Sequence, residues 1–346
     1  MKHLILSFIF LSCSLFGMNN QEIVCNGASI KPVLQSINTA DGTPLNLKHL
    51  EISKNHRICL SNDGRLYRGK NEQNTPLNSI QSSQSYTTYV QTMFNTDGTI
   101  IAAREPFGAI QFFYGKKDEK EHIVRTEPLH FPCDELYCNS LLETYDYVYT
   151  PGNNICYMFP IPSTNEKETT TTGDSSYFHN FENISVIHYY NNILTLYACG
   201  GANSSRIIFY KKISTGCEDM GAIGFPEEVN KIPLAVWHPS SLYCAFAVNN
   251  KVGLSNLQDT FNSKKAPLII NDSLVQDDTI QELFFASAKT IVIVGQKNIY
   301  FYYIDEDKLK SYPLPAYQYA KWHRLVQQLS LSNGNQALLY QFPHYN

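Results

Sequence analysis

The chain has 346 residues, of which 43% are hydrophobic and 17% are charged, and its formal net charge is −4 at pH 7. A chain this apolar can bury a sizeable core, and its charged fraction lies below the roughly 25% of an average domain. The small net charge excludes the strongly basic surfaces that bind nucleic acid or anionic membranes, so we expect no nucleic acid among its partners.

The first residues have the pattern of a targeting segment. Lys2 and His3 precede an apolar run over residues 4–16, and Gly17 then leads into a polar stretch. This order of a short basic region, an apolar region and a small residue predicts a secretory signal peptide over residues 1–17. A membrane anchor is the alternative, but the run is shorter than the roughly 20 apolar residues that cross a bilayer. We therefore expect an exported protein, periplasmic or secreted, without a membrane span.

The cysteines bear on the same question. Ser12-Cys13 resembles the cleavage site of a bacterial lipoprotein, although Phe10 and Leu11 depart from its usual pattern. A lipid anchor at Cys13 is therefore the alternative to full release. The other eight cysteines could form disulfides in an exported chain, but most lie in apolar strand patterns, which favours buried free thiols. No CxxC pair supports a structural zinc site.

One apolar pattern recurs seven times along the chain. Two apolar residues stand three apart, and a turn and a second apolar run follow them. The second members of these pairs are 43 to 50 residues apart, which is the period of a repeat fold. The seven pairs are Leu47/Leu50, Val90/Met93, Cys138/Leu141, Ile184/Ile187, Leu234/Trp237, Ile280/Leu283 and Val326/Leu329.

Each repeat is expected to consist of short strands. After the apolar pair come runs rich in β-branched and aromatic residues, such as residues 291–294 and 299–303, bounded by turn formers. A fourth, variable strand is predicted at residues 122–125, 267–270 and 308–312. No amphipathic helix is evident. The sequence therefore predicts an all-β fold, a seven-bladed β-propeller of four-stranded antiparallel blades, as a single domain over residues 20–346. An array of β-sandwiches is the alternative, but sandwiches do not usually repeat at this period.

The last repeat is incomplete, which predicts how the ring closes. It supplies an inner strand at residues 325–332 and a second strand at residues 336–342, and the sequence ends at Asn346. An open sheet edge is a liability that proteins avoid. Residues 20–37 contain a hairpin-like segment, so we predict that they complete the last blade as its third and fourth strands. The N- and C-terminal segments would then close the ring by pairing with each other.

Two segments resemble units of the WD-repeat propellers. Residues 90–114 look like one such unit, with Asn95-Thr96-Asp97-Gly98 at the place of the usual turn, and Trp237-His238-Pro239-Ser240 is similar to another form of that turn. The Trp-Asp dipeptide is absent, and pairs such as Phe113-Tyr114 stand in its place. The resemblance implies a ring that binds other proteins.

Candidate chemistry is sparse. His188 and His238 follow equivalent apolar pairs in neighbouring blades and could meet at the central channel, but acidic ligands do not recur at that position. We therefore predict no metal, no cofactor and no catalytic residues, and expect two packed histidines. His188, His238 and the adjacent Trp237 remain candidate binding residues.

The longest break in the repeat is a second candidate. Residues 163–180 are polar and lack apolar periodicity, which is typical of a disordered insertion. The functional interpretation is a recognition loop, because rigid scaffolds present variable loops. Tyr177, Phe178 and His179 would then be its contact residues, since exposed aromatics anchor interfaces.

Together these features predict a monomeric, non-catalytic binding scaffold for a protein or peptide in an exported compartment. Two alternatives remain open. One is a propeller hydrolase or lyase that acts through histidine and acidic residues of the channel. The other is a lipid-anchored scaffold of the cell envelope.

Overall fold

A computed structural model provides the structure of the chain. The residues it describes are 22–72, 75–80, 88–89, 91–94, 100–105, 110–114, 122–125, 142–143, 147–152, 155–160, 174–177, 183–190, 193–200, 204–213, 216–225, 233–238, 243–256, 268–270, 275, 277–324 and 326–343. Side chains are described mainly in residues 22–80 and from residue 204 onward. The predicted signal peptide and Cys13 lie outside these residues. Within them, no helix is long and apolar enough to cross a membrane.

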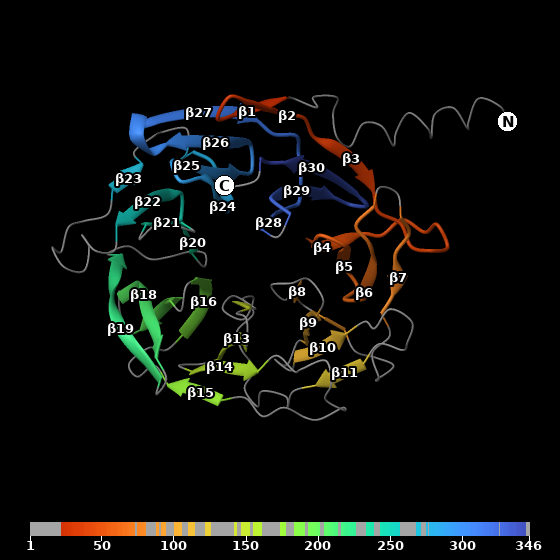
Figure 1. The fold of residues 1–346 in the computed structure, drawn as a ribbon, viewed down its shortest axis with the longest axis horizontal. Helices are drawn as coiled ribbons and strands as arrows, with labels where there is room; N and C mark the ends of the chain where they lie inside the picture. The colour runs from red at the N-terminus through yellow and green to blue at the C-terminus, as the bar shows by residue number, and fades with distance from the viewer. Residues whose placement is uncertain are drawn as a thin grey trace.

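Seven four-stranded antiparallel sheets form a ring, which confirms the predicted fold class (Figure 1). Each of the first six blades takes its strands from one continuous stretch of chain. Blade 1 comprises β4 (Leu47–Ile52), β5 (His56–Ser61), β6 (Leu66–Lys70) and β7 (Asn78–Ser79). Blade 2 comprises β8 (Gln91–Phe94), β9 (Ile100–Arg104), β10 (Ile110–Tyr114) and β11 (His122–Arg125). Blade 3 comprises β12 (Leu142–Glu143), β13 (Tyr147–Gly152), β14 (Ile155–Pro160) and β15 (Asp174–Tyr177).

The next three blades repeat this order. Blade 4 comprises β16 (Asn183–Tyr190), β17 (Ile193–Gly200), β18 (Ser204–Ile213) and β19 (Gly216–Phe225). Blade 5 comprises β20 (Leu234–Trp237), β21 (Tyr243–Val248), β22 (Lys251–Asn256) and β23 (Leu268–Ile270). Blade 6 comprises β24 (Ile280–Ser287), β25 (Thr290–Gly295), β26 (Asn298–Tyr303) and β27 (Lys308–Pro313), with the short 3-10 helix η1 (Ile304–Glu306) before β27. The first strand of each blade lies nearest the centre of the ring.

Blade 7 joins the two ends of the chain, as predicted, but with different strands. Its order is β28 (Tyr319–His323), β29 (Gln328–Asn333), β30 (Gln336–Gln341) and β3 (Val33–Ser36). In this sheet β3 pairs antiparallel with β30, so that Val33 faces Leu339. The C-terminal segment thus contributes three strands and the N-terminal segment only the fourth.

Two sequence predictions about this blade are therefore wrong. The inner strand is β28, not residues 325–332, and of the Val326/Leu329 pair Val326 lies in a turn and Leu329 in the second strand, β29. Trp322 on β28 is the residue equivalent to Trp237, but Lys321 and His323 flank it and give the strand a polar sequence. The shift in register explains why the last repeat seemed to lack a strand.

The hairpin that precedes β3 does not enter the blade. β1 (Ile23–Cys25) and β2 (Ala28–Ile30) form a separate two-stranded sheet along the outer rim, beside β27 (Figure 1). Ile23, Cys25 and Ile30 are buried in the core that blades 6 and 7 share. This hairpin is a clasp over the joint of blades 6 and 7, in addition to the closing strand.

The outer strands of blades 3 and 4 differ from the sequence predictions. The segment expected to be a loop at residues 163–180 contains β15, which pairs with β14 so that Tyr177 faces Ile155. The sequence Asp-Ser-Ser-Tyr of β15 has no apolar alternation, so the apolar pattern does not predict a strand there. β19 was not expected either.

The core lies between the blades. In each described cluster, side chains of one sheet pack against those of the next; for example, Phe246 of blade 5 packs in the core next to blade 4, against Phe225. Gly253 permits this packing, because a Cβ at this residue would come within 2.2 Å of the ring of Phe246. Among the described cysteines, Cys25, Cys59 and Cys244 are free and buried, as the strand patterns predict. Burial raises the pKa of the Cys25 and Cys59 thiols to about 12, so these thiols are unreactive.

Candidate polar site at the ring closure

The predicted loop residues lie at the edge of the described chain. Tyr177 ends the outer strand β15, while Phe178 and His179 lie outside the described residues. His188 is in the inner strand β16, and its side chain is not among those described. The structure therefore leaves these four candidates as predictions.

Trp237 and His238 are both in the core of the ring. Trp237 is 3% exposed; its indole Nε1–H donates to Thr195 Oγ1 at 2.7 Å, and its ring meets Phe209 edge-on. His238 is 1% exposed and its ring lies edge-on to Phe285, with centroids 5.1 Å apart. These contacts join blade 5 to blades 4 and 6, so both side chains hold the ring together. Because both side chains are buried, they expose almost no surface that another protein could contact.

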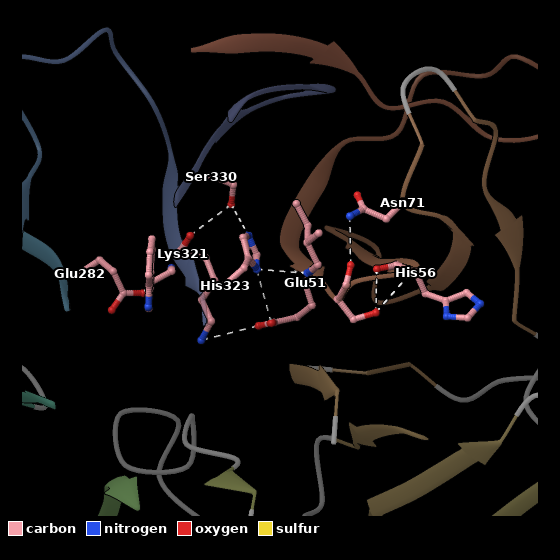
Figure 2. A network of polar contacts seen from close by, with 10 residues as sticks. Glu51, His56, Asn71, Glu282, Lys321, His323 and Ser330 are labelled. Atoms are coloured by element: carbon pink, nitrogen blue, oxygen red, sulfur yellow. Dashed lines mark hydrogen bonds and ion pairs between the residues drawn. The ribbon is translucent and has the colours of Figure 1, made fainter. Parts of the chain in front are cut away.

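A polar cluster that the spacing of the repeats does not predict lies where the ring closes. Figure 2 shows it spanning three consecutive inner strands, with side chains contributed by β24, β28 and β4 and one by β29. Its members, which we call the closure cluster, are Glu51, Glu282, Lys321, His323 and Ser330. Glu51 and His323 belong to blades 1 and 7, which meet only because the chain ends have joined.

His323 connects blade 7 to blade 1 through Nδ1, while its Nε2 contacts a serine of its own blade. The backbone N–H of Ile52 donates to His323 Nδ1 at 3.1 Å. The other nitrogen, Nε2, lies 2.8 Å from Ser330 Oγ, and the Ser330 hydroxyl lies 3.5 Å from the carbonyl oxygen of Lys321. Because Nδ1 accepts a hydrogen bond, the proton of the neutral imidazole is on Nε2, which donates to Ser330. The side chain of His323 is fully buried.

Glu51 and Lys321 form an ion pair across the same joint. Lys321 Nζ lies 3.6 Å from Glu51 Oε1, and 46% of the Lys321 side chain is accessible compared with 15% for Glu51. Burial acts to raise the pKa of Glu51, but the charge of Lys321 and the contact with His323 outweigh it, so the pKa is lowered. Glu51 in turn raises the pKa of Lys321. Both groups are charged at neutral pH.

Glu282 differs from Glu51 in that its carboxylate accepts hydrogen bonds from backbone N–H groups. Its Oε2 accepts from the N–H of Trp322 and its Oε1 from the N–H of Leu283, both at 3.1 Å. Burial raises its pKa although Lys321 and these donors act against the rise. A side chain of blade 6 thus satisfies a backbone N–H of blade 7, just as His323 of blade 7 satisfies Ile52 in blade 1.

An aromatic pair lies beside the cluster on the same inner strands. The rings of His49 on β4 and Tyr319 on β28 are 6.0 Å apart, and Tyr319 is 37% exposed. Burial, followed by the charge of Lys321, lowers the pKa of His49 to about 4. His49 is therefore neutral over most of the physiological range.

Three members of the cluster have the composition of a hydrolytic triad but not its geometry. In such a triad the imidazole nitrogen next to serine must be bare so that it can take the hydroxyl proton. Here Nε2 of His323 carries the proton, because Ile52 N–H occupies Nδ1, and Glu51 Oε2 is 3.8 Å from Nδ1. Ser330 is also 2% exposed. The arrangement is a structural joint and does not support nucleophilic catalysis.

Among the described residues, no group of three or more histidine, cysteine or acidic side chains could hold a metal ion. The closure cluster is consistent with that finding, since Lys321 lies between its two carboxylates.

A sequence signal for part of this cluster did exist. Trp322-His323 repeats Trp237-His238, and in both pairs the histidine reaches the next blade, at Ile52 and Phe285 respectively. Correct alignment of the seventh repeat would have placed His323 at the position of His238. The prediction of packed histidines agrees with the structure at His238, while the side chain of His188 lies outside the described residues.

Comparisons with known proteins identify the fold alone. No family model and no curated protein sequence matches the chain. Among solved structures, a chain from "Crystal Structure of Mitotic Checkpoint Complex" is similar at 12% sequence identity, with a TM-score of 0.62. The match covers 94% of this chain and 98% of that chain. The similarity therefore covers the whole ring, and at this identity it concerns the fold alone.

Replacement of Glu51 by glutamine should produce a pH-dependent loss of stability. Because the folded-state pKa of Glu51 is lowered from an ordinary value of 4.5, its ionised form stabilises the fold above that value, and this contribution disappears as pH falls through the lowered pKa. We expect Glu51→Gln to cost about 1 kcal/mol at pH 7 in urea unfolding, with the difference from wild type vanishing in acid. Glu306→Gln, on the exposed rim, is the control. An equal loss at all pH values would contradict the ionic role.

Proposed function

We propose that the protein is a non-catalytic scaffold that binds another protein or a peptide, a divergent relative of the WD-repeat propellers that works in an exported compartment. The observation that carries this proposal is the closure cluster. Its described groups include a serine, a histidine and a carboxylate; the histidine and the carboxylate join blades 7 and 1, and the serine bonds to the histidine. A rigid ring in which these polar side chains stabilise the fold is suited to presenting a binding surface to another protein.

The likeness in fold is consistent with this proposal. The similar chain is part of a complex, the mitotic checkpoint complex, and propellers in general offer loops and inner-strand residues on a fixed frame. In the present chain, Tyr319 and Lys321 are the exposed aromatic and cationic side chains of one inner strand. We propose that they and the segment at residues 164–172 form the contact surface.

Cross-linking and affinity capture with the intact protein would test this. We expect Tyr319→Ala/Lys321→Ala to reduce capture of the partner at least tenfold, since aromatic residues at interfaces commonly contribute about 2 kcal/mol or more. Replacement of residues 164–172 by a Gly-Ser linker should weaken capture as well, and it leaves β15 in place. The matched control is Tyr243→Ala/Lys251→Ala, an exposed pair of the same chemistry in blade 5.

The outcomes separate the alternatives. Capture that is unchanged in both inner-strand and linker variants would refute the proposed surface. Labelling of Ser330 by a fluorophosphonate would refute the non-catalytic assignment and favour a hydrolase. Mass spectrometry of the mature N-terminus would show cleavage near residue 17, an acylated Cys13, or an intact start; the last result would contradict export.

A further inference from the structure

Two groups of blade 1 compete for one nitrogen of His323. Ile52 N–H lies 3.1 Å from Nδ1 and needs it bare, while Glu51 Oε2 lies 3.8 Å from the same atom and could bond only to a protonated Nδ1. A ring nitrogen carries either a lone pair or a proton, so the two contacts exclude each other. The joint between the first and last blades therefore has two possible bonding states.

We propose that His323 is a proton-operated contact at the ring closure. In the neutral state its Nδ1 accepts from Ile52 N–H. When Nδ1 takes up one proton from solvent, the imidazolium releases Ile52 and pairs with Oε2 of Glu51, while Oε1 of the same carboxylate stays beside Lys321. The bond from Nε2–H to Ser330 is present in both states, so the imidazole stays in place while its partner on β4 changes.

The charged groups around His323 favour this exchange. Glu51 is already ionised, because Lys321 and His323 lower its pKa against the effect of burial. Lys321 lies 3.6 Å from the other oxygen, Oε1, so one carboxylate can pair with both cations. Glu282 faces Lys321 from β24 and would keep one carboxylate near it. Exposed Arg324 is the adjacent charge on the chain of His323.

The neighbouring histidine does not compete for the proton. Burial and the charge of Lys321 lower the pKa of His49 to about 4, so it remains neutral in weak acid. Imidazole is the side chain that ordinarily changes its charge between about pH 5 and 8. The contact with Ile52 would thus be exchanged for the contact with Glu51 when His323 gains its proton.

NMR titration of the full chain from about pH 8 to pH 5 tests the proposal. We expect the His323 Cε1–H signal, assigned with His323→Asn, to titrate with the same midpoint as the Ile52 amide. Glu51→Gln should lower that midpoint, since the imidazolium loses an opposite charge. The carbonyl of His323→Asn can still accept from Ile52, so this variant should leave the Ile52 amide unchanged across the range.

Two results would overturn the proposal. One is a His323 signal that does not titrate above about pH 5 in the folded protein. The other is a His323 titration during which the Ile52 amide does not move. Both are read from the wild-type protein, so a failure of either variant to fold would not prevent the decision.

Discussion

A chain that lacks residues 20–37 should melt roughly 10 °C or more below the intact protein, which corresponds to a loss of several kcal/mol for a domain of this size. The deletion removes the closing strand β3 and exposes the edge of β30 along its whole length. It also removes Ile37, which is fully buried between blades 7 and 1. Burial of one such side chain contributes about 1.5–3 kcal/mol.

The closing strand also satisfies a buried cation. Arg57 on β5 is 1% exposed; its Nη1 donates to Gln35 Oε1 at 3.0 Å, and its Nη2 donates to the carbonyl of Thr75. Burial lowers the pKa of Arg57. Without Gln35 the guanidinium would lose one of these bonds while still enclosed by protein, and a buried donor without a partner costs about 1–3 kcal/mol.

A shorter deletion provides the control. Removal of residues 20–30 takes away the clasp of β1 and β2 but keeps β3. The clasp buries Ile23, Cys25 and Ile30, and Asn26 Oδ1 accepts from Thr290 Oγ1. We expect a smaller fall in melting temperature, because the ring would still be closed. Equal effects of the two deletions in a thermal melt would show that the clasp, and not β3, closes the ring.

The central strands could be predicted from sequence because each satisfies a local rule. Residues 291–294 and 299–303 are β-branched or aromatic runs bounded by turns, and they form β25 and β26 nearly as expected. The outer strand β15 has the sequence Asp-Ser-Ser-Tyr, which carries no apolar alternation from which a strand could be predicted. The Val326/Leu329 pair shows that residue spacing alone can mislead. Its two apolar residues stand three apart, as in the other repeats, but Leu329 is in the second strand of the blade and not in the inner one.

The closure cluster was not predictable from spacing for a different reason. His323 and Ile52 are 271 residues apart in sequence, and their contact depends on the ring having closed. Charges at Glu51 and Lys321 look like ordinary surface residues when each is viewed in its own strand. Their role follows only from the adjacency of β28 and β4. The sequence nevertheless indicates the histidine position, through the repeated Trp-His pair.

Replacement of Phe284 by alanine is expected to cost about 3–5 kcal/mol, the range for a fully buried phenylalanine. Phe284 is fully buried in the core shared by blades 6 and 7. Its ring is stacked on Trp322, with centroids 3.8 Å apart and planes 4° apart, and it meets Phe342 edge-on at 5.1 Å. Trp322 is on the first strand of blade 7, and Phe342 directly follows its third strand. Phe284 therefore packs against two separate parts of the last blade.

The cost should be near the top of that range, because the neighbours cannot easily move into the space. Glu282 holds the backbone N–H of Trp322, and Phe342 N–H donates to the carbonyl of Gln327 at 2.9 Å. A cavity whose lining cannot relax retains its full penalty. Urea unfolding of Phe284→Ala against Leu268→Ala, whose side chain is half exposed and should change stability by less than about 0.5 kcal/mol, measures the difference. A loss below about 2 kcal/mol would mean that blade 7 shifts to fill the cavity, and the joint of blades 6 and 7 would then be looser than its aromatic packing indicates.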